Sequence, residues 1–166
     1  PRELKPMFES VIARHLIGDV GGAHVYRRVV RTTGQTESYI DELVQPLCRA
    51  WNTQVPSIST TVLASLGQID LHLTLVGANS AISNAALDVA VDELKLKLGS
   101  LVYSVDGATL PEVVGALLAK KRSSIGVAES CTGGLIASRL TDVPGSSIYF
   151  RGGLTTYSNE TKVSVL

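Results

Sequence analysis

The chain has few aromatic residues, two cysteines and no net charge. Lysine plus arginine number 15, as do aspartate plus glutamate, so the basic excess of dedicated nucleic-acid-binding proteins is missing and nucleic acid is not an expected partner. Cys48 and Cys131 lie far apart and match no metal-ligand spacing, which favours a reduced, cytoplasmic setting. No stretch approaches the roughly 18 consecutive apolar residues of a transmembrane helix. The first residues do not resemble a signal peptide either, so no membrane is expected.

What the chain does contain is enough apolar sequence for a packed core. It has 166 residues, 45% of them hydrophobic, which suits one ordinary domain or a small domain plus part of another. It opens on Pro1-Arg2-Glu3 without a methionine and ends in the middle of a pattern at Leu166. We therefore expect a piece of a longer protein.

Helical and extended patterns follow one another through the first part of the chain. Helical spacing of apolar residues is found in 6–16, 38–51 and 81–98, the last ended by Gly99. Alternating or β-branched sequence, typical of strands, is found in 24–33, 60–66, 68–77 and 101–105. From residue 24 onward, this order predicts a small α+β sandwich with helices on one face of a sheet.

A second part begins after the boundary expected at Asp106-Gly107-Ala108. Thr109 is the expected N-cap of a helix that runs to about Lys120, with Pro111 and Glu112 in its first turn. Next come a strand at 124–129, a helix at 133–140, a strand at 148–157 and a helix that begins at Ser158 or Asn159. This alternation predicts the start of an α/β unit.

The most informative run stands where a strand is expected to turn into a helix: Ala128-Glu129-Ser130-Cys131-Thr132-Gly133-Gly134. If the helix starts there, the backbone N–H groups of residues 131–133 lie free and attract a phosphate or an oxyanion. The alternative is a plain Ser/Thr cap with glycines that relieve a tight turn. Ser130 is a candidate nucleophile. Cys131 competes with it, but we favour a small buried side chain at that position.

A second run supplies a candidate base without any histidine: Thr155-Thr156-Tyr157-Ser158-Asn159-Glu160-Thr161-Lys162. The histidines all lie outside this segment, so Lys162 is the available base for a serine nucleophile. Tyr157 at the strand end and Lys162 in the next helical turn can point into one crevice. The alternative is a surface lysine and a rim tyrosine. A Tyr-x-x-x-Lys dehydrogenase motif does not fit, because four residues intervene and no G-x-G-x-x-G precedes it.

These runs resemble the competence/damage-inducible CinA family. The resemblance is strongest over 123–166, where it also includes Val143-Pro144-Gly145-Ser146-Ser147 and Gly152-Gly153, and it is to the C-terminal amidase domain. Arg31-Thr32-Thr33-Gly34, Glu37-Ser38 and the 60–105 region resemble a KH-like middle domain, and Glu3-Leu4-Lys5-Pro6-Met7-Phe8 resembles the end of a molybdopterin-binding-like domain. The resemblance implies three parts: the terminal helix of a preceding domain (1–22), a KH-like α+β domain (23–105), and the truncated N-terminal part of an α/β amidase domain (106–166).

The resemblance also implies a reaction. In nicotinamide-nucleotide amidases, water cleaves the carboxamide of nicotinamide mononucleotide to nicotinate mononucleotide and ammonia, in pyridine-nucleotide recycling. The family pattern assigns Ser130 as nucleophile, assisted by Tyr157 and Lys162. It implies a further arginine and a Gly-rich segment beyond Leu166, so we expect this chain to hold only part of the site. ADP-ribose hydrolysis is associated in the family with a domain that precedes this chain.

Our hypothesis is a cytoplasmic, homo-oligomeric amide hydrolase that acts on a small-molecule nucleotide without metal or cofactor. Substrate binding is assigned to Thr132, Gly133, Gly134, Ser158 and Asn159. The rival hypothesis is a non-catalytic oligomerisation or nucleic-acid-binding module. Its support is weak, because the GXXG-like stretch 18–21 contains an aspartate that repels phosphates. A third hypothesis is a phosphate-binding regulator without turnover.

Overall fold

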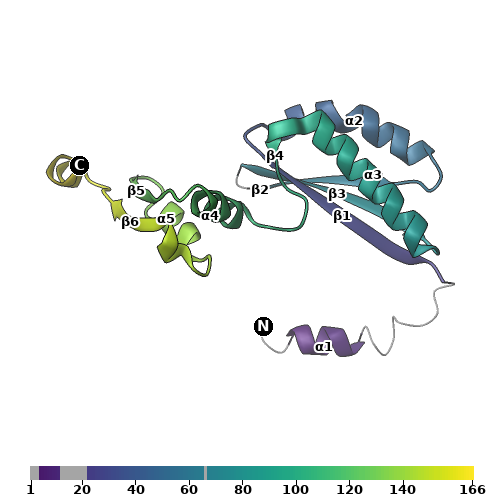
Figure 1. Cartoon of the computed structure of the whole chain (residues 1–166), viewed down its shortest axis with the longest axis horizontal. Helices are drawn as coiled ribbons and strands as arrows, with labels where there is room; N and C mark the ends of the chain where they lie inside the picture. Colours follow the sequence, from purple (N-terminus) through teal and green to yellow (C-terminus); the bar gives the residue numbers. More distant parts are fainter. Residues whose placement is uncertain (1–3, 12–21, 66) are drawn as a thin grey trace. The chain divides into compact units, whose positions relative to one another are not determined.

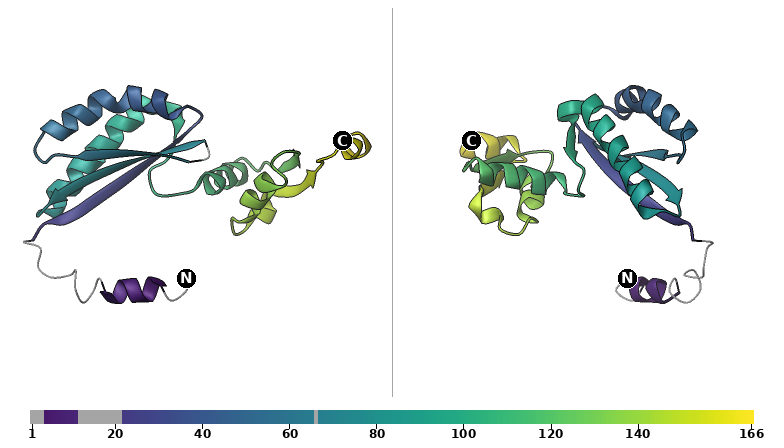
Figure 2. Two further views of the ribbon diagram at one scale, coloured as in Figure 1. Left: turned by 180° about the vertical axis from the view of Figure 1, so that it is seen from behind. Right: turned by 45° about the vertical axis from the view of Figure 1, so that its right-hand side comes forward.

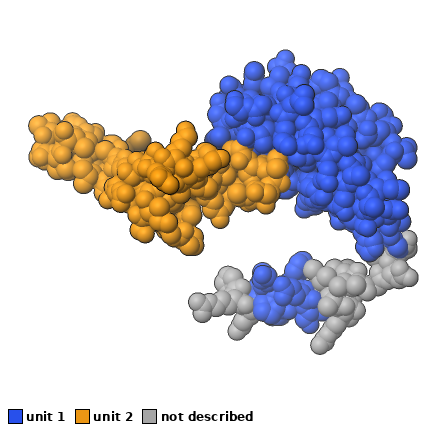
Figure 3. All heavy atoms as spheres, viewed as in Figure 1, with its two compact units in different colours: residues 1–102 blue, residues 103–166 orange. Residues whose placement is uncertain are grey.

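The computed structural model describes residues 4–11, 22–65 and 67–166, and the chain splits into two compact units, residues 1–102 and 103–166 (Figure 3). Both units mix helices and strands, so the expected α+β and α/β class is confirmed. The expected boundary at 105–106 falls close to this division, and the domain assignments themselves stay predictions. The GXXG-like stretch 18–21 lies outside the described residues. Within the described ranges, no helix has both the length and the apolar character needed to cross a membrane.

The first unit is an antiparallel sheet with two long helices on one face (Figures 1 and 2). The strand order of this sheet is β2-β3-β1-β4, with β1 (His24–Thr33), β2 (Ser59–Ser65), β3 (Gln68–Gly77) and β4 (Val102–Ser104). Strand β4 begins at the last residue of the first unit and continues into the first residues of the second. The helices of the first unit are α1 (Leu4–Val11), α2 (Glu37–Thr53) and α3 (Ser80–Leu98), followed by the 3-10 turn η2 (Gly99–Leu101). Helices α2 and α3 lie side by side over the sheet.

Alternation along the strands creates the core of this unit. Every second side chain of β3 is buried, as the sequence predicts: Ile69, Leu71, Leu73 and Leu75. They pack with buried side chains of β1, α2 and α3, including Val30, Ile40, Val44, Leu87 and Leu94. The indole Nε1 of Trp51 donates to the Glu93 carboxylate at 2.7 Å and so joins α2 to α3. One apolar face of the sheet is thus covered by two amphipathic helices.

The second unit alternates helices with two parallel strands (Figure 1). Its elements are α4 (Leu110–Lys120), β5 (Ile125–Glu129), α5 (Leu135–Thr141), η3 (Ser146–Ile148), β6 (Phe150–Thr155) and α6 (Asn159–Val165). The predicted capping of α4 is confirmed, because the N–H and hydroxyl of Thr109 both donate to Glu112 Oε2 at 2.7 Å. Tyr149 is buried between α4 and α5, and its hydroxyl donates to the Leu140 carbonyl at 3.2 Å.

Two elements of this unit begin or end at residues other than those predicted from the sequence. The helix expected at 133–140 begins only at Leu135, because Gly133 and Gly134 take positive φ values of 61° and 97° and form a left-handed turn first. The strand expected at 148–157 is limited to β6, because η3 precedes it. Of the helix expected at 6–16, the structure describes α1, and 12–16 lies outside the described residues.

Gly115→Ala tests the packing of α4 against Tyr149. A Cβ at this position would lie 2.6 Å from the Tyr149 hydroxyl oxygen. Alanine is favoured over glycine in a helix by about 1 kcal/mol, but overpacking a core costs about 1–3 kcal/mol. Because Tyr149 is buried and cannot move freely, we expect net destabilisation. The Ile125 amide, which donates to the Tyr149 carbonyl at 2.8 Å, should then exchange its hydrogen faster.

The matched control is Gly126→Ala in β5, where the nearest atom to an added Cβ is 3.6 Å away. This variant should leave Ile125 exchange close to that of the wild type. Protection of Ile125 that is unchanged or higher in Gly115→Ala would contradict the packing described.

Candidate active site at the ends of two parallel strands

The two sequence runs meet because β5 and β6 are parallel neighbours. Parallel strands present their carboxyl ends at the same edge of a sheet, where ligands bind in open α/β folds. Glu129, the last residue of β5, lies opposite Thr155, the last residue of β6. Beyond this pair, the Thr156 N–H donates to the Glu129 carbonyl at 2.8 Å. Ser130 and Tyr157 each directly follow one member of this bond, so the fold brings the two candidate side chains to one edge.

Ser130 opens a tight turn. The Gly133 N–H donates to the Ser130 carbonyl at 3.0 Å, and the Leu135 N–H donates to the Thr132 carbonyl at 3.1 Å. Ser130 is half-buried, whereas Cys131 is exposed. The preferred expectation of a buried Cys131 is therefore wrong, since its side chain leaves the turn on the solvent side.

The carboxylate of Glu129 is the main group that the sequence reasoning missed. Glu129 is only 4% exposed, and its two oxygens accept hydrogen bonds from the N–H groups of Ile136 at 3.0 Å and Ala137 at 2.8 Å. Both N–H groups belong to the first turn of α5, where backbone N–H groups have no acceptor within the helix. A side-chain carboxylate from the preceding strand thus satisfies the start of this helix.

Hydrogen bonding keeps this carboxylate ionised. Burial acts to raise the pKa of Glu129, but the N–H groups of Ala137 and Ile136 outweigh it and hold the pKa below its ordinary value. The Thr132 hydroxyl and the Gly134 N–H interact with the same carboxylate and lower its pKa further. The start of α5 is therefore already occupied by a negative charge, the carboxylate of Glu129.

This arrangement changes which backbone N–H groups are free to bind an anion, compared with those expected from the sequence. The sequence suggested free N–H groups at residues 131–133, but that of Gly133 is bonded to Ser130, and the first turn of α5 is occupied by Glu129. Thr132 and Gly134, expected at the substrate, also interact with Glu129. In this fully described part of the chain, the N–H groups of Cys131 and Thr132 have no protein acceptor. They are the donors left for a ligand next to Ser130.

Tyr157 and Lys162 stand on either side of the start of α6. Tyr157 is 72% exposed, and Lys162 is half-buried in the helix, where its N–H donates to the Ser158 carbonyl at 3.0 Å. Among the described residues, neither the Lys162 ammonium nor the Tyr157 hydroxyl forms a hydrogen bond with Ser130. The structure thus brings Ser130 and Tyr157 to one edge without closing a three-residue hydrogen-bonded set.

The other two expected substrate ligands lie in the same segment. Ser158 caps α6, and its hydroxyl accepts the Thr161 N–H at 3.1 Å. The cap expected from sequence is therefore Ser158, and Asn159 is the exposed first residue of the helix. The Ser158 hydroxyl therefore already accepts a hydrogen bond from its own helix.

The described parts of the chain gather no group of three or more His, Cys, Asp or Glu side chains able to hold a metal ion. A surface groove of about 530 Å³ lies in the first unit, between α2 and α3. It contains none of the residues predicted for catalysis or substrate binding.

Comparison with known proteins supplies relatives for the whole chain. Residues 107–166 match a family model described as the CinA C-terminal domain. The chain is 39% identical, over 98% of its length, to a CinA-like protein of Koribacter versatilis, and 38% identical over its full length to a CinA-like protein of Solibacter usitatus. It is also 39% identical over its full length to a protein of Symbiobacterium thermophilum named as competence-damage inducible. The chain spans 38%, 39% and 38% of the length of these three relatives.

The ionised state of Glu129 predicts that the second unit loses stability in acid, when this carboxylate becomes protonated. Because the folded-state pKa lies below the ordinary value of 4.5, the stabilisation is complete above that value and is lost as the pH falls through the folded-state pKa. The amide proton shifts of Ile136 and Ala137, followed by NMR, should titrate together below pH 4.5.

Glu129→Gln should remove this titration, because the amide of glutamine does not ionise in this pH range. Its single carbonyl oxygen can accept from only one of the two backbone donors. Glu37→Gln, an exposed carboxylate of the other unit, is the control and should leave the titration unchanged. Amide shifts of Ile136 and Ala137 that do not move with pH in the wild-type chain would show that Glu129 does not bind them.

Proposed function

Because residues 107–166 belong to the CinA C-terminal domain family, we propose that this chain carries the first part of a nicotinamide-nucleotide amidase site. The observation that supports it most is the placement of Ser130 and Tyr157, each directly after the hydrogen-bonded ends of neighbouring parallel strands. The proposed substrate is nicotinamide mononucleotide. The products are nicotinate mononucleotide and ammonia.

In the proposed first step, Lys162 takes the proton of the Ser130 hydroxyl, and the oxygen attacks the carboxamide carbon of the substrate. The carbonyl oxygen becomes an oxyanion, stabilised by the N–H groups of Cys131 and Thr132. Both groups lie on the turn that follows the nucleophile, and neither has a protein acceptor within this described unit. They are two of the three N–H groups, those of residues 131–133, that the sequence suggested, because the N–H of Gly133 is bonded to Ser130.

In the second step, the carbon–nitrogen bond breaks and the nitrogen leaves as ammonia. Tyr157 passes the proton taken by Lys162 to this nitrogen, so the charge balances. Tyr157 is exposed and therefore able to contact a bound substrate. Water then hydrolyses the ester on Ser130, which releases the carboxylate product and restores the hydroxyl.

A phosphorylated substrate suits the charge of this region. Beyond residue 117 the sequence has six basic side chains, namely Lys120, Lys121, Arg122, Arg139, Arg151 and Lys162. Against them stand three acidic ones: Glu129, Asp142 and Glu160. Since the Glu129 charge is satisfied by backbone donors, the remaining excess is positive.

We also propose the wider assignments that follow from this function. Residues 23–105 form a KH-like domain after the last helix of a preceding domain within 1–22, and 106–166 begin the amidase domain. The protein acts in the cytoplasm as a homo-oligomer on a small nucleotide. Since the chain spans under two-fifths of its relatives, further groups of the site are proposed to come from the rest of a chain of that length.

A non-catalytic ligand-binding module is the second candidate. It is favoured by one observation: no hydrogen bond links Lys162 to Ser130 among the described residues. Such a module would be stabilised by nicotinamide mononucleotide without releasing ammonia. A nucleic-acid-binding module would instead give a gel shift that weakens steeply with salt.

Ser130→Ala tests the proposed nucleophile. In a protein of the relatives' length that contains these residues, the variant should lose ammonia release from nicotinamide mononucleotide by about 10³-fold or more, because the attacking oxygen is gone. Ammonia is measured by a coupled enzymatic assay, and substrate binding by calorimetry.

Cys131→Ser is the matched control, since it alters the next side chain of the same turn and should retain most of the activity. Retained turnover in Ser130→Ala together with its loss in Cys131→Ser would assign the nucleophile to the thiol instead. No turnover in the wild-type protein, with binding intact, would favour the ligand-binding module.

A further inference from the structure

Strand β2 forms an open edge of the sheet in the first unit. It pairs with β3 on one side, and on the opposite side it pairs with no other strand of the described chain. Alternate residues of an edge strand direct their backbone N–H and C=O groups outward, where a further strand can pair with them. We propose that β2 binds an extended peptide that ends in a free carboxylate and adds to the sheet as a further strand. This inference does not rest on the proposed amidase activity.

The sequence of β2 leaves this edge unprotected. Proteins block sheet edges with charged side chains, prolines, bulges or very short strands. None of the seven residues of β2 is charged or a proline. Its register with β3 is regular from Ser59 to Ser65, so no bulge turns the edge away. At the other edge of the sheet, β4 has only three residues. The edge at β2 is therefore the one suited to a peptide.

A pocket of about 290 Å³ lies between α2 and the beginning of β2. It is lined by Cys48, Arg49, Asn52, Ile58, Ser59 and Thr60. This volume is at the lower limit of pockets that enclose small-molecule ligands, about 300–1,000 Å³, and it suits the last residue of a peptide. A peptide antiparallel to β2 runs from Ser65 toward Ser59, so its carboxyl end arrives at this pocket.

The unused polar groups of the pocket are hydrogen-bond donors. Arg49 donates to Gln45 Oε1 at 2.9 Å through one nitrogen, and none of the ion pairs among the described residues uses its charge. The Thr60 hydroxyl is buried and has no hydrogen-bond partner in the described chain. A buried hydroxyl without a partner is unfavourable, so a ligand that accepts from it gains stability. Hydrogen bonds from a guanidinium to a carboxylate are among the strong ones.

The backbone acceptors near the pocket are already satisfied. At the end of α2, the Thr53 hydroxyl donates to the Ala50 carbonyl at 2.9 Å, and the Ile58 N–H donates to the Trp51 carbonyl at 3.1 Å. No acidic side chain lines the pocket. Because the donors are unused and these acceptors are occupied, the pocket favours a ligand that accepts hydrogen bonds and carries negative charge.

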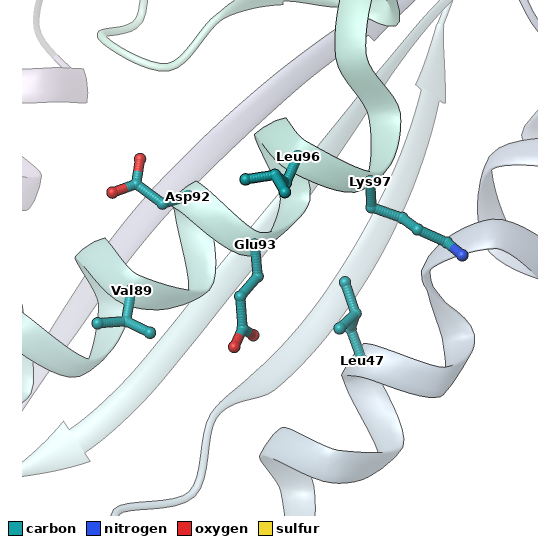
Figure 4. A pocket seen from close by; sticks show the side chains of 6 residues that line it. All are labelled: Leu47, Val89, Asp92, Glu93, Leu96 and Lys97. Carbon is teal, nitrogen blue, oxygen red and sulfur yellow. The ribbon is translucent and has the colours of Figure 1, made fainter.

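The larger groove between α2 and α3 is less suited to a carboxylate. Figure 4 shows Leu47 of α2 on one side of it and, on the other, residues of α3, namely Val89, Asp92, Glu93, Leu96 and Lys97. Two carboxylates stand against one ammonium group, so the charge around this groove is negative and repels a peptide carboxylate. The charge of the two grooves therefore assigns the carboxyl end to the pocket beside β2.

The test selects ligands from a library of random heptapeptides with free carboxyl termini and titrates a selected peptide into the isotope-labelled 166-residue chain. We expect binding, with the largest NMR amide shifts in β2 and at Arg49. The same peptide with an amidated carboxyl terminus should bind about tenfold more weakly or worse, because its charge-assisted hydrogen bonds are lost.

Two substitutions test the donors of the pocket. Arg49→Gln should raise the dissociation constant of the peptide about tenfold or more. The matched control is Arg27→Gln, at an exposed arginine of β1, which should leave this constant unchanged. Thr60→Val should raise the constant about threefold or more without lowering the melting temperature of the free chain, since its hydroxyl has no partner there to lose.

A library that yields no peptide bound at β2 would overturn the proposal, as would a selected peptide that binds equally well after amidation. Hydrogen exchange of the chain without peptide shows whether the edge is free. If all amide hydrogens of β2 are protected there, a second copy or, in a protein of the relatives' length, another segment occupies the edge, and the peptide is excluded.

Discussion

The buried carboxylate of Glu129 is the interaction on which the candidate site depends. Its oxygens satisfy the first turn of α5, and its own carbonyl accepts both the N–H and, at 3.4 Å, the hydroxyl of Thr156. One residue therefore fixes the helix that follows Ser130 and the strand end that precedes Tyr157. A buried carboxylate without such partners would be strongly unfavourable, so the charge and its donors stabilise each other.

The position of the Glu129 carboxylate also determines which backbone N–H groups remain available to a ligand. The start of a helix is a ready anion site only while its N–H groups are free, and here the chain supplies the anion. The donors left to a substrate are those of the turn, at Cys131 and Thr132, beside the candidate nucleophile. The turn thus carries the proposed nucleophile and the N–H groups proposed to stabilise an oxyanion on adjacent residues. The electrostatics favour charge that develops at Ser130 rather than a phosphate held on α5.

Much of the fold follows from local pattern. The alternation in β3 predicts its buried face, and the Thr109–Glu112 spacing predicts the start of α4. The late start of α5 could not be read from spacing, because the left-handed φ values of Gly133 and Gly134 depend on the whole turn. The role of Glu129 was missed for a similar reason: a charged residue at a strand end is usually exposed, and only the returning helix supplies its donors. The placement of Ser130 and Tyr157 at one edge of the sheet depends on the parallel pairing of β5 and β6. This pairing joins segments that are far apart in sequence, so local pattern does not predict it.

The most direct test of the proposed chemistry is to identify the residue that becomes acylated. Protein of the relatives' length is mixed with nicotinamide mononucleotide, quenched in acid within milliseconds, digested and mapped by mass spectrometry. The proposal predicts that the nicotinate mononucleotide acyl group is attached to Ser130. An acyl group on Cys131, or ammonia release with no acylated peptide at any time point, would contradict it.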